Sequence, residues 1–219
     1  MTARTRPLAT AVVAVAVLAL AACGGESSGE DGGSSAAAPD RSSFKPITTQ
    51  GLAAVVDEHL GSKVSEFYVF ADEQDDVLEE RYLGVRLRGA DPRDSFVVTV
   101  YPPGGAGDQV PTGSCPDAGG GSDDPLASES CFPVKGGGNV TITTFSQGLA
   151  EDNTAGTYRM ATSSGPAERQ VTASYESYTK QPPISDKELS ALLGDPDLGW
   201  KTSPKTNRAG ADLKIAQEE

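Results

Sequence analysis

The sequence predicts an α+β domain in which a mostly antiparallel sheet carries an N-terminal and a C-terminal helix packed on it. Strand-like runs follow one another without an intervening helical segment, which favours antiparallel pairing. One amphipathic segment precedes these runs and a second one follows them, and two such helices can cover one face of a sheet. A β-sandwich with peripheral helices stays open as the alternative.

Residues 47–60 are predicted to form the first helix. Their apolar side chains recur three and four residues apart, as one face of a helix requires. This stripe consists of Leu52, Val55, Val56, His59 and Leu60. Thr48 or Thr49 can cap the start of the helix, and Gly61 can end it.

Six runs have the continuous or alternating apolar pattern that is typical of strands. They are 67–71, 81–88, 96–101, 140–145, 157–162 and 170–178. The last two runs flank a Ser-Ser-Gly-Pro turn and predict a hairpin. Residues 102–138 are rich in Gly and Pro and are predicted to form one long loop.

Residues 185–193 are predicted to form the second helix. Ser185 and Glu188 have the spacing of a capping box, and Ile184 can pack against Leu189 as a hydrophobic staple. Gly194 stands where the helix should end. The residues that follow, 201–219, are expected to form a loose polar tail.

The first 22 residues have the layout of a secretory signal peptide. Arg4 and Arg6 precede an uncharged run over 8–20 of mostly Ala, Val and Leu. This run is too short to span a bilayer, which needs about 20 apolar residues. We expect residues 1–22 to be removed, either as a lipoprotein signal or as an ordinary signal peptide cut after Ala22.

The residues Leu20-Ala21-Ala22-Cys23 resemble the lipobox of bacterial lipoproteins. The resemblance implies a diacylglyceryl group on the Cys23 thiol and cleavage just before that cysteine. Two acyl chains give stable membrane anchoring, whereas one does not. Residues 23–43 lack large apolar side chains and predict a disordered tether. The folded domain is then expected over 44–200, on the extracytoplasmic face of the cell membrane.

The remaining cysteines, Cys115 and Cys131, predict one disulfide in an oxidising compartment. A zinc site is a poor alternative because two thiols without nearby histidines fall short of four ligands. The chain has a net charge of −13, and removal of Arg4 and Arg6 makes it more negative. Such a chain is repelled by nucleic acid, so nucleic-acid partners are not expected.

No motif in the sequence is characteristic of a particular reaction, so no catalytic residue and no cofactor are predicted. His59, the single histidine, lies on the apolar stripe and is interpreted as a packing residue, with a catalytic base as the alternative. Two Ser-x-x-Lys strings, beginning at Ser42 and Ser177, lack the helical context of penicillin-binding enzymes. We interpret both as chance matches.

Two groups of residues are weak candidates for ligand binding. The acidic residues Asp72, Asp75 and Asp76, together with a second cluster in the long loop, resemble calcium-binding loops only in composition, so no metal site is predicted. Four tyrosines could line a ligand groove, although cross-strand packing explains them as well. They are Tyr101, Tyr158, Tyr175 and Tyr178.

These observations predict a lipid-anchored extracytoplasmic protein of non-catalytic role that binds a protein or an envelope component. The whole chain resembles the small secreted lipoproteins of high-GC Gram-positive bacteria in its lipobox, its Gly/Ser/Asp linker and its composition. The first alternative is a small-molecule or metal-binding lipoprotein that serves a transporter. The second is a secreted hydrolase that uses His59.

Overall fold

The structure is a computed structural model. It describes residues 41–70, 80–105, 115, 127–134, 138–148, 155–164, 169–178 and 183–218. The chain divides into two units, 1–39 and 40–219, and every described residue belongs to the second. The lipobox, Cys23, most of the predicted tether and the acidic residues Asp72, Asp75 and Asp76 lie outside the described residues.

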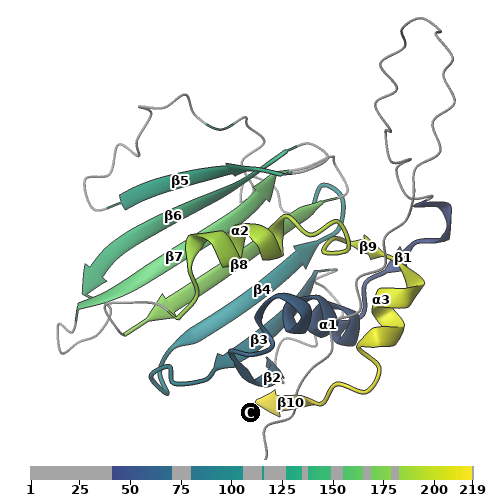
Figure 1. Ribbon diagram of the computed structural model, residues 1–219, viewed down its shortest axis with the longest axis horizontal. Coiled ribbons are helices and arrows are strands. Elements are labelled where there is room, and N and C mark those ends of the chain that lie inside the picture. Colours follow the sequence, from purple (N-terminus) through teal and green to yellow (C-terminus); the bar gives the residue numbers. More distant parts are fainter. Residues whose placement is uncertain are drawn as a thin grey trace, which may run out of the picture. The chain divides into compact units, whose positions relative to one another are not determined.

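The domain is built on one mixed sheet of eight strands (Figure 1). In spatial order the strands are β10 (Ile215–Glu218), β2 (Val64–Phe70), β3 (Arg81–Leu87), β4 (Ser95–Tyr101), β8 (Gln170–Ser177), β7 (Ala155–Ser164), β6 (Asn139–Gly148) and β5 (Ala127–Pro133). All neighbours pair antiparallel except β10 and β2, which pair parallel. The sheet-rich α+β class that the sequence predicts is confirmed.

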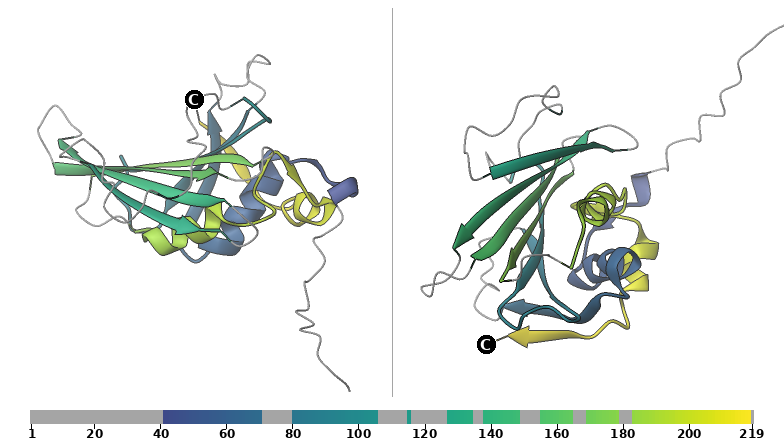
Figure 2. Two further views of the ribbon diagram at one scale, coloured as in Figure 1. Left: turned by 90° about the horizontal axis from the view of Figure 1, so that it is seen from above. Right: turned by 60° about the vertical axis from the view of Figure 1, so that its left-hand side comes forward.

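In the part of the chain that the structure describes, three helices accompany this sheet, and a short second sheet joins two segments at its side. The helices are α1 (Thr49–Leu60), α2 (Asp186–Leu193) and α3 (Pro204–Ala209), preceded by a 3-10 turn, η1 (Arg41–Ser43). The second sheet pairs β1 (Lys45–Pro46) with β9 (Lys201–Thr202). Figure 2 shows the helices on one face of the large sheet. We call the opposite face the distal face.

The hydrophobic core lies between the sheet and the helices. Alternate strand residues enter it, as in β4, where Phe96, Val98 and Val100 are buried. The helices contribute the apolar side chains that their spacing predicts, including Leu52 and Val56 of α1. α1 contacts β2 and β3, whereas α2 contacts β6, β7 and β8.

Both predicted helix starts have the caps that the sequence indicates. The Thr48 side chain accepts a hydrogen bond from the Gly51 N–H, so Thr48, rather than Thr49, caps α1. Ser185 and Glu188 form the predicted capping box at α2. Local sequence signals therefore identify both caps, although α1 begins at Thr49 and not at residue 47.

The prediction of a continuous loop over 102–138 is wrong for residues 127–133. These residues form β5, which pairs with residues 139–145 of β6. The sequence Ala-Ser-Glu-Ser-Cys-Phe-Pro contains no β-branched residue, so its strand propensity is low. Pairing with β6 and the disulfide at Cys131 stabilise it instead.

The prediction of a loose tail over 201–219 is wrong for residues 201–218. This segment contains β9, α3 and β10, and Ile215 packs against the hydrophobic core. Asn207 of α3 accepts a hydrogen bond from the Thr48 N–H, 3.0 Å away, at the start of α1. A Cβ on Gly51 would lie 2.2 Å from the Asn207 side chain, so the glycine permits this close approach. Long-range contacts of this kind leave no periodic signal in the tail itself.

The N-terminal end of α2 is held by two cationic side chains. Arg159 of β7 is 3% exposed, and its guanidinium donates to the Ile184 carbonyl and pairs with the Asp186 carboxylate. Lys63 donates to the Pro183 carbonyl at 2.6 Å and to the Glu188 carboxylate at 2.7 Å. The hydrogen bond from Lys63 lowers the pKa of Glu188 to about 2.

The C-terminal end of α2 is held in the same manner. Arg169, which is 6% exposed, donates to the carbonyl oxygens of Leu193 and Asp195 at 3.1 and 2.7 Å. Positive charge at the carbonyl end of a helix also interacts favourably with the helix dipole. Together, Lys63, Arg159 and Arg169 attach both ends of α2 to the rest of the domain.

We predict that Arg159→Met lowers the free energy of unfolding by about 1–3 kcal/mol, because the Ile184 carbonyl and the Asp186 carboxylate lose their partner. The measurement is urea denaturation followed by circular dichroism. The matched control is Lys187→Met on the exposed side of α2, which should change stability by less than about 0.5 kcal/mol. Equal effects of the two substitutions would contradict the role given to Arg159.

Candidate binding surface on the distal face

The distal face consists of the strand residues that alternate with the core residues. On β4 and β8 these are Ser95, Val97, Thr99, Tyr101, Gln170, Thr172, Ser174 and Glu176. Most of their side chains are partly exposed. The strand pairing fixes them in rows across the sheet, because directly paired residues point to the same face.

One row across the distal face is composed of threonines. Thr141, Thr162, Thr172 and Thr99 are direct neighbours on β6, β7, β8 and β4. Tyr82 of β3 pairs with Thr99 and extends the row. Adjacent strands lie about 4.8 Å apart, so the threonines are regularly spaced, although Thr162 is only 4% exposed.

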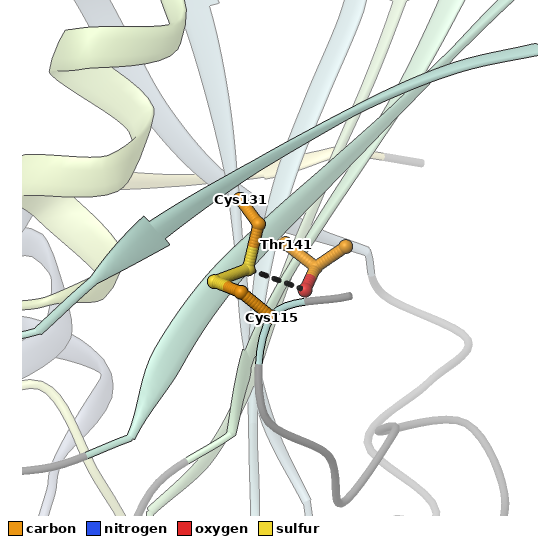
Figure 3. The surroundings of a disulfide bond; sticks show 3 residues. All are labelled: Cys115, Cys131 and Thr141. Atoms are coloured by element: carbon orange, nitrogen blue, oxygen red, sulfur yellow. Dashed lines mark hydrogen bonds between the residues drawn. A yellow bond between two sulfur atoms is a disulfide. The ribbon is translucent and has the colours of Figure 1, made fainter. Parts of the chain in front are cut away.

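The predicted disulfide lies at one end of the threonine row. Cys131 of β5 pairs with Thr141 of β6, and the Cys131 sulfur lies 3.7 Å from the Thr141 hydroxyl oxygen (Figure 3). Cys115 and Cys131 are bonded, with their Cα atoms 5.6 Å apart. The disulfide joins Cys115 to the edge strand β5, as the sequence predicts.

The structure divides the four candidate tyrosines between the two faces. Tyr175 points toward the helices, is 1% exposed and donates a hydrogen bond to the Asp94 carboxylate at 2.8 Å. It is therefore a core residue. By strand alternation, Tyr101, Tyr158 and Tyr178 lie on the distal face.

An aromatic and acidic group of residues occupies the distal face over β6, β7 and β8. We call Phe145, Tyr158, Glu176 and Tyr178 the aromatic–acidic cluster. Phe145 pairs with Tyr158, and their ring centroids are 6.0 Å apart. Tyr158 pairs in turn with Glu176. Burial and the nearby charge of Glu176 raise the pKa of the Tyr158 hydroxyl, so this hydroxyl is a neutral donor and acceptor at neutral pH.

A second aromatic group lies on β2 and β3. Tyr68 contacts Phe70 edge to face, with ring centroids 5.3 Å apart, and Phe70 lies 6.4 Å from Tyr82. The Tyr68 ring covers Gly84 of β3, where an added Cβ would lie 2.3 Å from the ring. The Arg86 guanidinium lies 4.9 Å from the centre of the Tyr68 ring.

Carboxylates complete the surroundings of Arg86. This guanidinium pairs with Glu66 at 3.4 Å and with Glu218 of β10. A cation is thus bound on this part of the face by a tyrosine ring and two carboxylates. Sequence analysis missed the arrangement because Glu218 belongs to the segment that was predicted to be a loose tail.

His59 lies on the helical side of the domain, away from the distal face. Its Nε2 atom is 2.7 Å from the Asp195 carboxylate, and the two side chains are 23% and 18% exposed. The hydrogen bond to Asp195 raises the pKa of His59. Burial favours the neutral form of Asp195, but hydrogen bonds from His59 and the Asp197 N–H outweigh it and lower the pKa of Asp195. The pair therefore links α1 to the segment after α2.

A shallow depression of about 240 Å³ lies between the end of β5 and α2. It is lined by Phe132, Pro133, Val134, Ser190, Ala191 and Gly194. The lining contains no charged side chain. Within the described ranges, no group of three His, Cys, Asp or Glu residues is arranged to hold a metal ion. In the same part of the chain, no helix is both long and apolar enough to cross a membrane.

The chain matches no protein-family model, no curated protein and no solved structure with which it was compared.

We predict that the His59–Asp195 pair makes stability depend on pH. The folded-state pKa of His59 lies above its ordinary value of 6.5, so the contribution is complete below pH 6.5 and is lost as the pH rises through the folded-state pKa. His59→Gln should cost about 1–2 kcal/mol at pH 5.5 and should remove this loss at high pH. Thermal unfolding from pH 5.5 to 9 measures both effects. Parallel pH profiles of the two proteins would contradict the prediction.

Proposed function

We propose that this chain is a lipid-anchored protein on the extracytoplasmic side of a cell membrane and that it binds a protein or another envelope component without catalysing a reaction. The anchor is the acylated Cys23 of the lipobox-like residues 20–23. The tether is the Gly- and Ser-rich segment 23–43, and the binding domain follows it. The Cys115–Cys131 disulfide supports an oxidising, extracytoplasmic location.

The distal face carries the proposal of a binding role. Every described helix lies on the other face of the sheet (Figure 2). The distal face holds partly exposed aromatic side chains, among them Phe145, Tyr158 and Tyr178. Aromatic residues are enriched at protein interfaces because they bury a large area with little loss of side-chain entropy. The strand pairing holds these rings at fixed positions.

The positions of the reactive and aromatic side chains in the domain favour binding over catalysis. His59, the candidate base, bonds to Asp195 on the helical side of the domain, and in the described residues no hydrogen bond joins it to a Ser, Thr or Cys side chain that could act as a nucleophile. The hydroxyl-rich and aromatic surface lies on the distal face instead. A binding role uses that surface without requiring a nucleophile, a base or a metal.

We predict that Cys23→Ala moves the protein from the membrane fraction to the soluble fraction, because no acyl chain can then be attached. Cell fractionation with immunoblotting measures the distribution. Ser27→Ala, outside the lipobox-like residues, is the control and should stay in the membrane fraction. Continued membrane retention of the Cys23 variant would refute the anchor.

We predict that the partner contacts the distal face. A photo-crosslinking amino acid at position 172, in the middle of the threonine row, should capture an envelope component in intact cells. The same amino acid at position 187, on the exposed side of α2, should not. Mass spectrometry of the adducts identifies what is attached. Equal capture from both positions, or capture from position 187 alone, would refute the distal face as the binding surface.

A further inference from the structure

The charge on the distal face is unbalanced. Within the described strands of the large sheet, this face carries the carboxylates of Glu66, Glu129, Glu176 and Glu218 and one guanidinium, Arg86. Arg86 is already bound by Glu66 and Glu218. Of the acids that remain, Glu176 belongs to the aromatic–acidic cluster, and Glu129 lies beside the cluster on β5. The excess negative charge agrees in sign with the net charge of −13 for the whole chain.

The same face already binds cations through its tyrosines. The Arg86 guanidinium lies 4.9 Å from the Tyr68 ring centre, and the Arg93 guanidinium lies 4.4 Å from the Tyr178 ring centre. Arg93 also pairs with Asp91 at 3.0 Å. In both cases a carboxylate and an aromatic ring bind one guanidinium, so the domain uses this combination repeatedly.

Tyr158 and Glu176 offer the same combination at the centre of the aromatic–acidic cluster. The tyrosine ring and the carboxylate stand side by side on β7 and β8, and Phe145 supports the ring from β6. The Tyr178 hydroxyl is 3.5 Å from the Glu176 carboxylate, which is a weak contact, and the Tyr178 ring is already covered by the Arg93 guanidinium. In the described part of the chain, the cation–ring contacts on this face involve Tyr68 and Tyr178 and leave the Tyr158 ring unused.

We propose that the aromatic–acidic cluster binds an arginine or lysine side chain of a basic segment in the partner. The cation would lie over the Tyr158 ring and donate hydrogen bonds to Glu176. Cation–π attraction and a charge-assisted hydrogen bond act together at such a site. Glu129, on the neighbouring edge strand, adds negative charge for a second basic residue of the segment. This inference rests on the proposed binding role and names the chemistry of the partner.

The test is binding of a labelled nine-residue peptide of alternating arginine and serine to the full-length chain, measured by fluorescence anisotropy at moderate salt. A peptide of alternating glutamine and serine is the neutral probe and should not bind. Glu176→Gln and Tyr158→Ala should each weaken binding of the arginine peptide about fivefold. Tyr158→Phe keeps the ring and should bind within about twofold of the original protein.

Asp212→Asn is the matched control, because it removes one exposed carboxylate from the turn before β10, outside the sheet. It should leave the affinity for the arginine peptide within about twofold. Equal weakening by Asp212→Asn and Glu176→Gln would overturn the site, since binding would then follow net charge alone.

Unaltered binding by the Glu176 variant, or no binding by the original protein, would also overturn the site. Partner capture from position 172 in cells would in that case leave the proposed function standing with a partner of different chemistry. Thermal unfolding of each variant verifies that the fold is intact, and Glu176→Gln tests the site even if Tyr158→Ala fails to fold.

Discussion

The arrangement of this domain depends on buried and half-buried cations that bind the ends of α2. A guanidinium such as that of Arg159 is costly to bury unless its donors are satisfied. Here the acceptors lie at the start of the helix: the Ile184 carbonyl just precedes its N-cap, and the Asp186 carboxylate belongs to its first turn. Arg169 uses the carbonyl groups at the other end. Because the buried guanidinium groups need these acceptors, they determine where α2 lies along β6, β7 and β8.

This constraint also explains why the two faces of the sheet differ in composition. With α2 and α1 fixed on one face, the core-directed residues of β4 and β8 are apolar or aromatic apart from Ser177, as Val98 and Tyr175 illustrate. The alternating residues of the same strands are Thr, Ser, Gln and Glu, with Val97 and Tyr101 as the exceptions. Threonine supplies the branched side chain that a strand favours without adding a large apolar area to the surface.

The sequence predicts those features that depend on neighbours in the chain. The capping box of Ser185 and Glu188, the cap at Thr48 and the alternation in β3, β4 and β8 are all visible within a few residues. β5 and the C-terminal segment were missed because β5 lacks branched residues and Asn207 acts on a helix far away in the chain. Only part of the binding surface could be predicted from the sequence. Three of the four candidate tyrosines share one face, but the register that places Tyr158 beside Glu176 follows from pairing across strands.

Strand β4, with Ser95 and Val97 on the distal face, separates the two aromatic groups, and the separation bears on how the face is used. At β2 and β3 the tyrosine ring and the carboxylates enclose Arg86 of the same sheet, so this site is filled from within and ties β10 to β2 and β3. At β7 and β8 the corresponding ring and carboxylate belong to Tyr158 and Glu176. The tyrosine ring and carboxylates at β2 and β3 thus stabilise the fold at the C-terminal edge of the sheet. At Tyr158 and Glu176 no guanidinium is among the described contacts, so the same combination of ring and carboxylate is available to a cation from outside.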